Sequence, residues 1–291
     1  MKSSYYKYFA ALLLFGSNGI VASNINLPSY EIVLLRLLLG SLFLIAVFMA
    51  SGQKFTFYRN KHTCLYLFIS ASAMGASWML LYEAYHQVGV SIASLAYYCG
   101  PVIVMILSPF LFRETLTWPK IAGFLTVLAG MCLVNLQALD EGKTIWGLFC
   151  GLMSAFMYAL MVTANKKAKP ESGLENSLLQ LVIGSFIVVA FVSMQKNFVL
   201  SLTTIDWIPV LLLGLLNTGI GCYLYFSSIT DLPVQTVAIC GYLEPLSAIV
   251  FSVLFLHEIL LPLQMLGAVL ILGGAIFGAV SYTHLRAHET A

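Results

Sequence analysis

Charged residues are scarce in this chain, and their scarcity excludes most soluble folds. Asp, Glu, Lys and Arg make up 9% of the 291 residues, whereas hydrophobic residues make up 60%. Soluble domains contain about 25% charged residues on average. One water-soluble core cannot bury this much apolar surface, so we expect a lipid bilayer to surround the molecule.

The sequence also lacks the motifs of catalysis, metal binding and nucleic acid binding. The longest basic run is Lys166-Lys167, which argues against a nucleic acid partner. The six cysteines lie in apolar segments without CxxC spacing, so we interpret them as packing thiols. His257-Glu258 lacks the second histidine of a zincin, and GxSxG and Walker motifs are absent. We therefore expect no catalytic residues, no metal and no cofactor, and a polytopic membrane enzyme is the least favoured alternative.

Long apolar segments divide the chain into candidate membrane spans. A span needs about 20 mainly apolar residues, and turn or charge signals such as Leu27-Pro28-Ser29 and Lys169-Pro170-Glu171 separate the segments. The predicted fold is an all-α integral membrane protein with ten transmembrane helices. The spans are expected at residues 5–23, 29–50, 62–86, 90–112, 118–138, 144–165, 174–195, 205–229, 233–256 and 262–281.

The chain matches itself without a gap at an offset of 144 residues. Each copy holds five spans, so we expect one repeat at residues 5–138 and a second at 144–281. An odd number of spans turns the second copy upside down in the membrane, and inverted repeats are typical of secondary transporters. Residues 282–291 differ in composition from both copies, and we interpret them as a non-native or disordered tail. The matched positions are Gly40-Ser41 and Gly184-Ser185, Tyr98 and Tyr242, Pro101 and Pro245, Ser108 and Ser252, Glu114 and Glu258, Gly123 and Gly267, and Gly130 and Gly274.

The distribution of lysine and arginine predicts which way the bundle faces. With the N-terminus in the cytoplasm, the cytoplasmic segments carry 11 of these residues and the outer loops carry only Lys143 and Lys196. Arg36 lies inside the second span. Because Lys and Arg are enriched in cytoplasmic loops, we expect both termini in the cytoplasm.

Several short motifs resemble one family of transporters. Arg36 lies in the second span, Glu114 and Glu258 close the fourth and ninth spans, and Glu244-Pro245 lies within the ninth. In this spacing, over residues 5–281, they are similar to the EamA type of the drug/metabolite transporter superfamily. The resemblance implies a protein of the bacterial cytoplasmic membrane that exports amino acids and other small metabolites. It also implies that gradients rather than ATP drive the transport.

Glu244 is the first candidate for a functional site. It lies about 12 residues from either end of its span, near the bilayer midplane. An ionisable side chain at this depth costs several kcal/mol unless it faces a cavity or a partner. We interpret Glu244 as a ligand for a substrate amine or for a coupling proton. The alternative is a structural glutamate, paired with a tyrosine hydroxyl, with Arg36 or with backbone freed by Pro245.

Arg36 is the only basic residue predicted at membrane depth. Its guanidinium could hold a carboxylate or a phosphate with two parallel hydrogen bonds. It could also reach outward to the interface or pair with Glu31 or Glu244. The equivalent position in the second repeat is the neutral Gln180.

Proline disrupts the fourth and ninth spans at equivalent places. Pro101 and Pro245 lie a third to a half of the way into these spans, where the missing N–H and the ring break helix regularity. Such a kink survives in lipid only against protein or a water-filled cavity. We expect paired hinges or cavity walls, and the alternative is a pair of packing kinks.

Aromatic residues gather at the same depth as these prolines. Tyr98 and Tyr242 precede the prolines by three residues, about one helical turn, and are predicted to line a cavity with Trp78 and Tyr158. Aromatic faces and hydroxyls suit an amphiphilic or cationic substrate.

Other polar and aromatic residues allow two interpretations. Asn18 and Asn217 lie in mid-span and are candidates for substrate binding or for hydrogen bonds between helices. Tyr82 and Tyr225 lie near span ends, where we expect them in the aromatic belts at the membrane interfaces.

The predicted function is secondary transport by alternating access, with export of a zwitterionic, cationic or neutral small molecule. The expected partners are this substrate, the lipid bilayer and a possible coupling proton, and no nucleic acid. The alternative is exchange or import of organic anions such as sugar phosphates or nucleotide sugars, which a single deep cation, Arg36, disfavours. Small-residue spacing such as Gly147-xxx-Gly151 permits close helix contacts within one bundle or between two copies, so a monomer and a homodimer both stay open.

Overall fold

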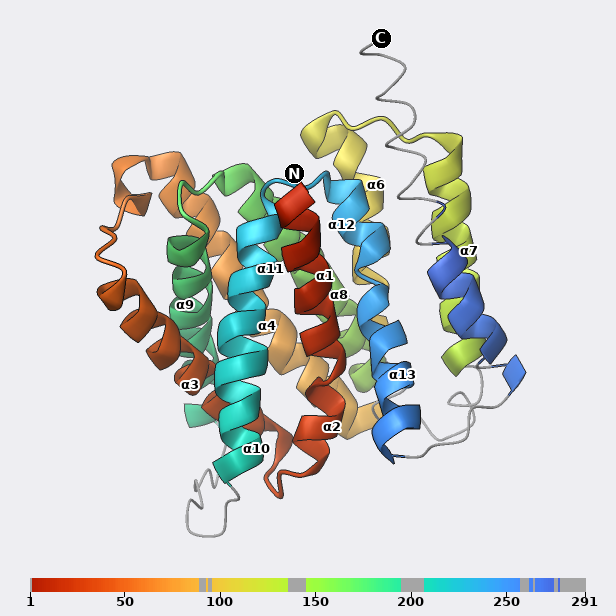
Figure 1. Ribbon diagram of the computed structural model, residues 1–291, viewed down its shortest axis with the longest axis horizontal. Helices are drawn as coiled ribbons and strands as arrows, with labels where there is room; N and C mark the ends of the chain where they lie inside the picture. The colour runs from red at the N-terminus through yellow and green to blue at the C-terminus, as the bar shows by residue number, and fades with distance from the viewer. Residues whose placement is uncertain are drawn as a thin grey trace.

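The computed structural model describes residues 2–88, 93, 96–135, 145–194, 207–256, 262–263, 265–274 and 277. Within these ranges the chain forms a bundle of helices without a strand (Figure 1). The helices of the first half are α1 (Lys2–Gly16), α2 (Asn18–Ser23), α3 (Ser29–Ala50), α4 (Lys61–Val88), α6 (Gly100–Phe112) and α7 (Trp118–Asn135), with a 3₁₀ turn at Phe57–Arg59. Those of the second half are α8 (Ile145–Ala168), α9 (Gly173–Ser193), α10 (Trp207–Leu211), the π-helix Leu212–Ile220, α11 (Gly221–Ile229), α12 (Val234–Cys240) and α13 (Leu243–Leu256).

In the described part of the chain, six stretches of helix are long and apolar enough to cross a membrane. They are Tyr30–Ala50, Lys61–Tyr85, Ile145–Ala168, Gly173–Ser193, Trp207–Ile229 and Val234–Phe255. Shorter apolar helices run over Gly100–Phe112 and Met265–Gly274. The chain is therefore a multi-pass membrane protein, and the count of ten spans stays a prediction.

The bundle is apolar outside and partly polar inside, the reverse of a soluble protein. Large apolar side chains such as Phe110 and Phe186 are 81% and 69% exposed, whereas Asn165 and Asn176 are fully buried. These two amides bond to each other, with Asn165 Nδ2 2.9 Å from Asn176 Oδ1. Polar groups in lipid need partners inside the protein, so this arrangement is the one a bilayer requires.

Residues that match at the 144-residue offset meet in space. The Ser41 hydroxyl on α3 lies 3.0 Å from the Ser185 hydroxyl on α9. A Cβ atom added at Gly130 would lie 2.6 Å from the Gly267 carbonyl oxygen. A Cβ atom added at Gly274 would lie 2.6 Å from the Gly123 carbonyl oxygen, and Gly123 matches Gly267 at this offset. The two contacts are reciprocal, and they join α7 to the helix Met265–Gly274, which lies beside it at one edge of the bundle in Figure 1.

The two prolines follow breaks in helix rather than kinks within it. A turn at Tyr98 and Cys99 precedes α6, in which Pro101 is the second residue. A turn at Gly241 and Tyr242 separates α12 from α13, in which Pro245 is the third residue. Proline is tolerated in the first turn of a helix, because N–H groups there have no partner within the helix. Each proline therefore begins a new helical segment, where a continuous span with a kink was predicted.

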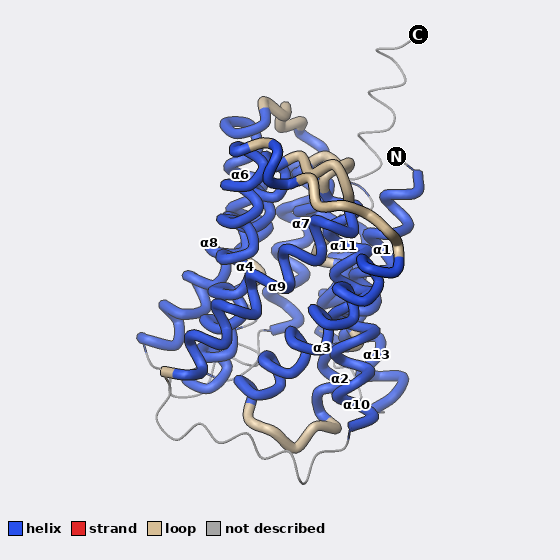
Figure 2. Tube along the Cα trace, turned by 90° about the vertical axis from the view of Figure 1, so that its left-hand side faces the viewer, coloured by secondary structure: helices blue, strands red, loops and turns tan. Residues whose placement is uncertain are grey.

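Several loops lie at the same end of the bundle as the N-terminus. They join α6 to α7, α8 to α9 and α11 to α12, and Figure 2 shows them as tan segments at that end. Arg113 and Lys169 are part of these connections. We call this the N-terminal end; its predicted cytoplasmic location stays a prediction.

Candidate functional site

Arg36 lies buried in the middle of the bundle. It is 6% exposed, and its Nε donates a hydrogen bond to Thr218 Oγ1 at 2.9 Å. Its guanidinium carbon lies 4.6 Å from the centroid of the Trp78 ring, which is a cation–π contact between α3 and α4. Within the described ranges no ion pair or hydrogen bond joins Arg36 to Glu31 or Glu244, the two partners considered from the sequence.

Thr218 belongs to the π-helix Leu212–Ile220, which the sequence did not predict. Its hydroxyl accepts from Arg36 and donates to the Leu213 carbonyl oxygen at 2.8 Å, five residues earlier. A π-helix has one extra residue in its turn, and such turns are frequent at functional sites. The sequence signal for this site is a mid-span pair of polar residues, Asn217-Thr218. Only Asn217 is among the predicted site residues.

Asn217 joins the π-helix to the junction of α1 and α2. Its Nδ2 lies 2.8 Å from the Leu14 carbonyl oxygen, 2.8 Å from Ser17 Oγ and 3.0 Å from Asn18 Oδ1. The two predicted asparagines are thus brought together. Their contact is a hydrogen bond between helices.

Tyrosines at the two helix breaks form an aromatic cluster. The Tyr242 hydroxyl donates to the Tyr98 carbonyl oxygen at 2.7 Å, and the two ring centroids are 6.4 Å apart. The Tyr97 ring lies 5.7 Å from Tyr98 and 5.5 Å from Tyr158. The cluster therefore contains Tyr97, Tyr98, Tyr158 and Tyr242, and the lining of a cavity by these residues stays a prediction.

Tyr225 extends this cluster toward α1, and its predicted place in an interface belt is wrong. It is 5% exposed, its ring lies 5.6 Å from that of Tyr8, and its hydroxyl lies 3.3 Å from the Tyr158 hydroxyl. A phenol with a partner inside the bundle need not reach the interface to satisfy its hydroxyl. Tyr8, which is fully buried and donates to the Val237 carbonyl oxygen, carried no signal in the sequence beyond its place in an apolar span.

Glu244 lies in the first turn of α13, directly after the break that contains Tyr242. Its half-buried carboxylate interacts electrostatically with Arg36 and with the hydroxyls of Tyr97, Tyr98 and Tyr158. Within the described part of the chain this carboxylate accepts no hydrogen bond.

Gly100, the repeat partner of Glu244, leaves room for a tyrosine. A Cβ atom added at Gly100 would lie 2.7 Å from Cδ1 of Tyr158. The glycine position in one half is thus filled by an aromatic ring, while the equivalent position in the other half carries a charge.

The cluster of Arg36, Trp78, Tyr97, Tyr98, Tyr158 and Glu244, here called the central cluster, combines one acid, one base and aromatic faces. A carboxylate can hold an ammonium group, and a guanidinium can hold a carboxylate. Within the described residues, no group of three or more His, Cys, Asp or Glu side chains is placed to hold a metal ion. The cysteines are free thiols, as expected.

Two glutamates tie the halves of the bundle together at the N-terminal end. The Glu114 carboxylate accepts from the backbone N–H groups of Val234, at 2.8 Å, and Gln235, at 3.1 Å. It therefore caps the N-terminus of α12 from outside the helix. Glu258, the matching glutamate, lies outside the described residues.

The second of these contacts is made by Glu175 at the start of α9. Its carboxylate accepts from Thr56 N and Thr56 Oγ1, both at 2.6 Å, and from Phe57 N at 2.9 Å. We refer to the contacts of Glu114 and Glu175 as the end clamps. Both cross from one half of the sequence to the other.

Known proteins resemble this chain over most of its length. The uncharacterized transporter YxxF of Bacillus subtilis (strain 168) is 28% identical over 275 residues, which cover 92% of this chain and 86% of that protein. The biotin transporter of Salmonella typhimurium (strain LT2) is 22% identical over 237 residues, or 80% of this chain and 77% of that protein. A solved crystal structure with 18% identity superposes with a TM-score of 0.81 and covers 96% of this chain and 98% of its own, so the fold is shared.

One family profile matches the chain twice, once in each half. The matches cover residues 3–136 and 145–279, which together span nearly all of the described helices. This chain belongs to the EamA-like transporter family.

Proposed function

We propose that the protein is a secondary transporter that exports amino acids or similar small zwitterionic or cationic metabolites by alternating access. The observation that carries the proposal is the central cluster, in which the carboxylate of Glu244 and the guanidinium of Arg36 interact electrostatically while no hydrogen bond joins them within the described residues. Two opposite charges at membrane depth match the two charges of a zwitterion. The aromatic rings of Trp78 and Tyr158 provide apolar contact for a side chain.

Alternating access is supported by the arrangement of the two halves. The family profile matches each half separately, and the contacts of Ser41 with Ser185 and of Gly130 with Gly267 join matching elements. An inverted five-plus-five repeat accounts for these reciprocal contacts. In this proposal the breaks before Pro101 and Pro245 are the hinges about which the halves rock.

In the transport cycle each residue of the cluster has a separate task. Glu244 binds the substrate ammonium or, in exchange for it, a proton. The remaining N–H groups of Arg36 bind the substrate carboxylate while its Nε stays bonded to Thr218. Trp78 and Thr218 fix the guanidinium in place, so that it does not collapse onto Glu244 when the site is empty.

A second candidate substrate class is a monocarboxylate without an amine. Relatives named as biotin transporters are 22% identical to this chain over 237 residues, and Arg36 alone would suffice to bind one carboxylate. For such a substrate the carboxylate of Glu244 would act only on protons.

The test is release of a labelled panel of amino acids and organic acids from cells with matched surface expression. We expect the wild type to release one substrate class above empty-vector cells and Glu244→Gln to lose that release. The control Glu171→Gln, which removes an exposed carboxylate at the N-terminal end, should retain it. Release that Glu244→Gln leaves unchanged would remove Glu244 from the mechanism. Absence of release by the wild type for both classes would contradict the proposed direction and substrate.

A further inference from the structure

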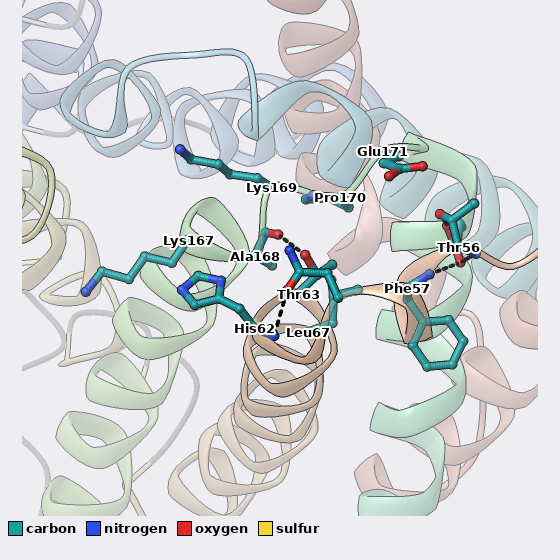
Figure 3. Close-up of a pocket in the computed structure, with 12 residues that line it drawn as sticks. Thr56, Phe57, His62, Thr63, Leu67, Lys167, Ala168, Lys169, Pro170 and Glu171 are labelled. Atoms are coloured by element: carbon teal, nitrogen blue, oxygen red, sulfur yellow. Dashed lines mark hydrogen bonds between the residues drawn. The ribbon is translucent and has the colours of Figure 1, made fainter.

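A polar cavity lies at the N-terminal end, away from the central cluster. Its volume is about 320 Å³, and it lies between the start of α4 and the connection from α8 to α9 (Figure 3). The residues around it are Thr56, Phe57, Asn60, His62, Thr63, Leu67, Lys167, Ala168, Lys169, Pro170, Glu171 and Glu175.

The charge of this cavity is basic on the side of α4 and α8. Lys167 and His62 both contact the Tyr66 ring, with Lys167 Nζ 5.9 Å from its centroid and the imidazole centroid 4.5 Å from it. Lys169 is exposed at the rim, and within the described residues neither lysine forms an ion pair or a hydrogen bond. The basic groups are therefore available to a ligand.

The acidic groups at the cavity lie on the side of Thr56 and Phe57, apart from the lysines. Glu175 is 1% exposed, and its carboxylate is occupied by the three hydrogen bonds from Thr56 and Phe57. Glu171 is exposed, and in the view of Figure 3 it lies on the side of Thr56, away from Lys167. At the C-terminus of α8, the Ala168 carbonyl oxygen accepts a hydrogen bond from the Thr63 hydroxyl at 2.9 Å.

The cavity borders the surface that faces lipid. Leu65 and Phe68 follow the cavity residues His62 and Thr63 on α4. They are 57% and 56% exposed, as expected for side chains in contact with acyl chains. Tyr66 lies between them in sequence and carries the contacts with Lys167 and His62. A ligand with a charged head beside the lysines could thus extend an apolar tail along α4.

We propose that this cavity binds an anionic phosphate group, supplied by a phospholipid headgroup. Basic pockets between transmembrane helices suit anionic headgroups, because Lys is a strong point-charge partner for phosphate and its stem packs against apolar surface. Free inorganic phosphate has the same chemistry but lacks the tail, so experiment separates the two sources. The inference concerns a site outside the central cluster and holds whatever the transported substrate is.

The experiment is a titration of the purified full-length protein with phosphatidylglycerol, phosphatidylcholine or inorganic phosphate, read out as the thermal unfolding temperature. We expect phosphatidylglycerol to raise this temperature above the phosphatidylcholine baseline. The midpoint of the titration should shift about 25-fold to higher lipid in the double variant Lys167→Gln/Lys169→Gln, about fivefold for each lysine. Lys54→Gln, an exposed lysine of the same end that does not line the cavity, should shift it less than twofold.

Each outcome decides the inference. A rise with inorganic phosphate at similar concentration, lost in the double variant, assigns the site to free phosphate and keeps the phosphate chemistry. Restored binding in Lys167→Arg/Lys169→Arg confirms that positive charge is what matters. Equal stabilisation by both lipids without a phosphate effect, or equal shifts in the double variant and in Lys54→Gln, overturns the inference. Because the readout is unfolding and not transport, these results are independent of the proposed function.

Discussion

Removal of the Glu114 carboxylate tests whether the end clamps hold the N-terminal end of the bundle closed. In Glu114→Ala the N–H groups of Val234 and Gln235 lose their acceptor, and the seven-residue helix α12 loses its cap. A capping carboxylate contributes about 2 kcal/mol in favourable, partly buried geometry. If the bond exists only in the closed state, its loss raises the equilibrium constant for opening about 30-fold.

Two native cysteines report on this opening. Cys240, the last residue of α12, is 2% exposed. Cys150 is fully buried near the start of α8, at the end of the bundle opposite the N-terminal end. Modification of a buried thiol by a maleimide is proportional to the fraction of molecules in which it is exposed, as long as that fraction is small. Modification of each cysteine is measured by mass spectrometry in membrane vesicles over time. We expect Glu114→Ala to raise the rate at Cys240 about 30-fold and to leave the rate at Cys150 unchanged.

The controls separate local opening from unfolding. Glu114→Gln keeps one acceptor oxygen and should give an intermediate rate at Cys240. A parallel rise at Cys150 would indicate global unfolding instead of opening. A wild-type rate at Cys240 in Glu114→Ala would refute the reasoning, because the clamp would then contribute nothing to closure.

Two further predictions concern the helix packing and the central cluster. Gly130→Ala should lower the thermal unfolding temperature, because its Cβ would lie 2.6 Å from the Gly267 carbonyl oxygen and force the backbones apart, at a cost of about 1–3 kcal/mol. The matched control is Gly19→Ala, where a Cβ would meet no atom within 4 Å. An equal change in the unfolding temperature of both variants would contradict the packing argument. Trp78→Leu should lower transport without lowering surface expression, because the loss of the cation–π contact at 4.6 Å frees the Arg36 guanidinium. If the dependence of release on substrate concentration is unchanged in Trp78→Leu, Trp78 does not orient Arg36.

Pattern and chemistry in the sequence predicted which residues lie near one another, but not how they bond. The offset of 144 residues singled out Ser41, Ser185, Tyr98 and Tyr242, and both pairs are in contact. Apolar length and the scarcity of charge identified a membrane protein. These features follow from composition and from duplication, which are properties of the chain itself.

The bonding partners depended on local geometry that periodicity does not encode. The π-helix shifts Thr218 by one residue relative to a regular helix and turns its hydroxyl toward Arg36. The break at Gly241 and Tyr242 places Glu244 in a first turn instead of in mid-helix. The sequence could not place Tyr225 beside Tyr8 and Tyr158, because these contacts depend on how α1, α8 and α11 pack. Tertiary packing decided each of these points.

Glu175 and its repeat partner Glu31 differ in a way that bears on the state of the transporter. Glu175, at the N-terminal end, accepts three hydrogen bonds from the loop after α3. Glu31 starts the equivalent helix at the opposite end, and its buried Oε2 has no hydrogen-bond partner among the described residues. A buried carboxylate oxygen without a donor costs free energy, so it favours any rearrangement that supplies one.

Under the proposed inverted repeat, opening of the N-terminal end would release the donors of Glu175 while closure of the opposite end supplies donors to Glu31. The two glutamates would then exchange roles between the two states, and the free energies of their hydrogen bonds would largely cancel over the cycle. Such cancellation is what a transporter without ATP requires, because a gradient can drive the exchange only if neither state is much more stable than the other. Glu31→Ala should therefore leave the closed N-terminal end intact and disfavour its opening, because the opposite state loses the hydrogen bonds of Glu31. Equal acceleration of Cys240 modification by Glu31→Ala and by Glu175→Ala would contradict this division of roles.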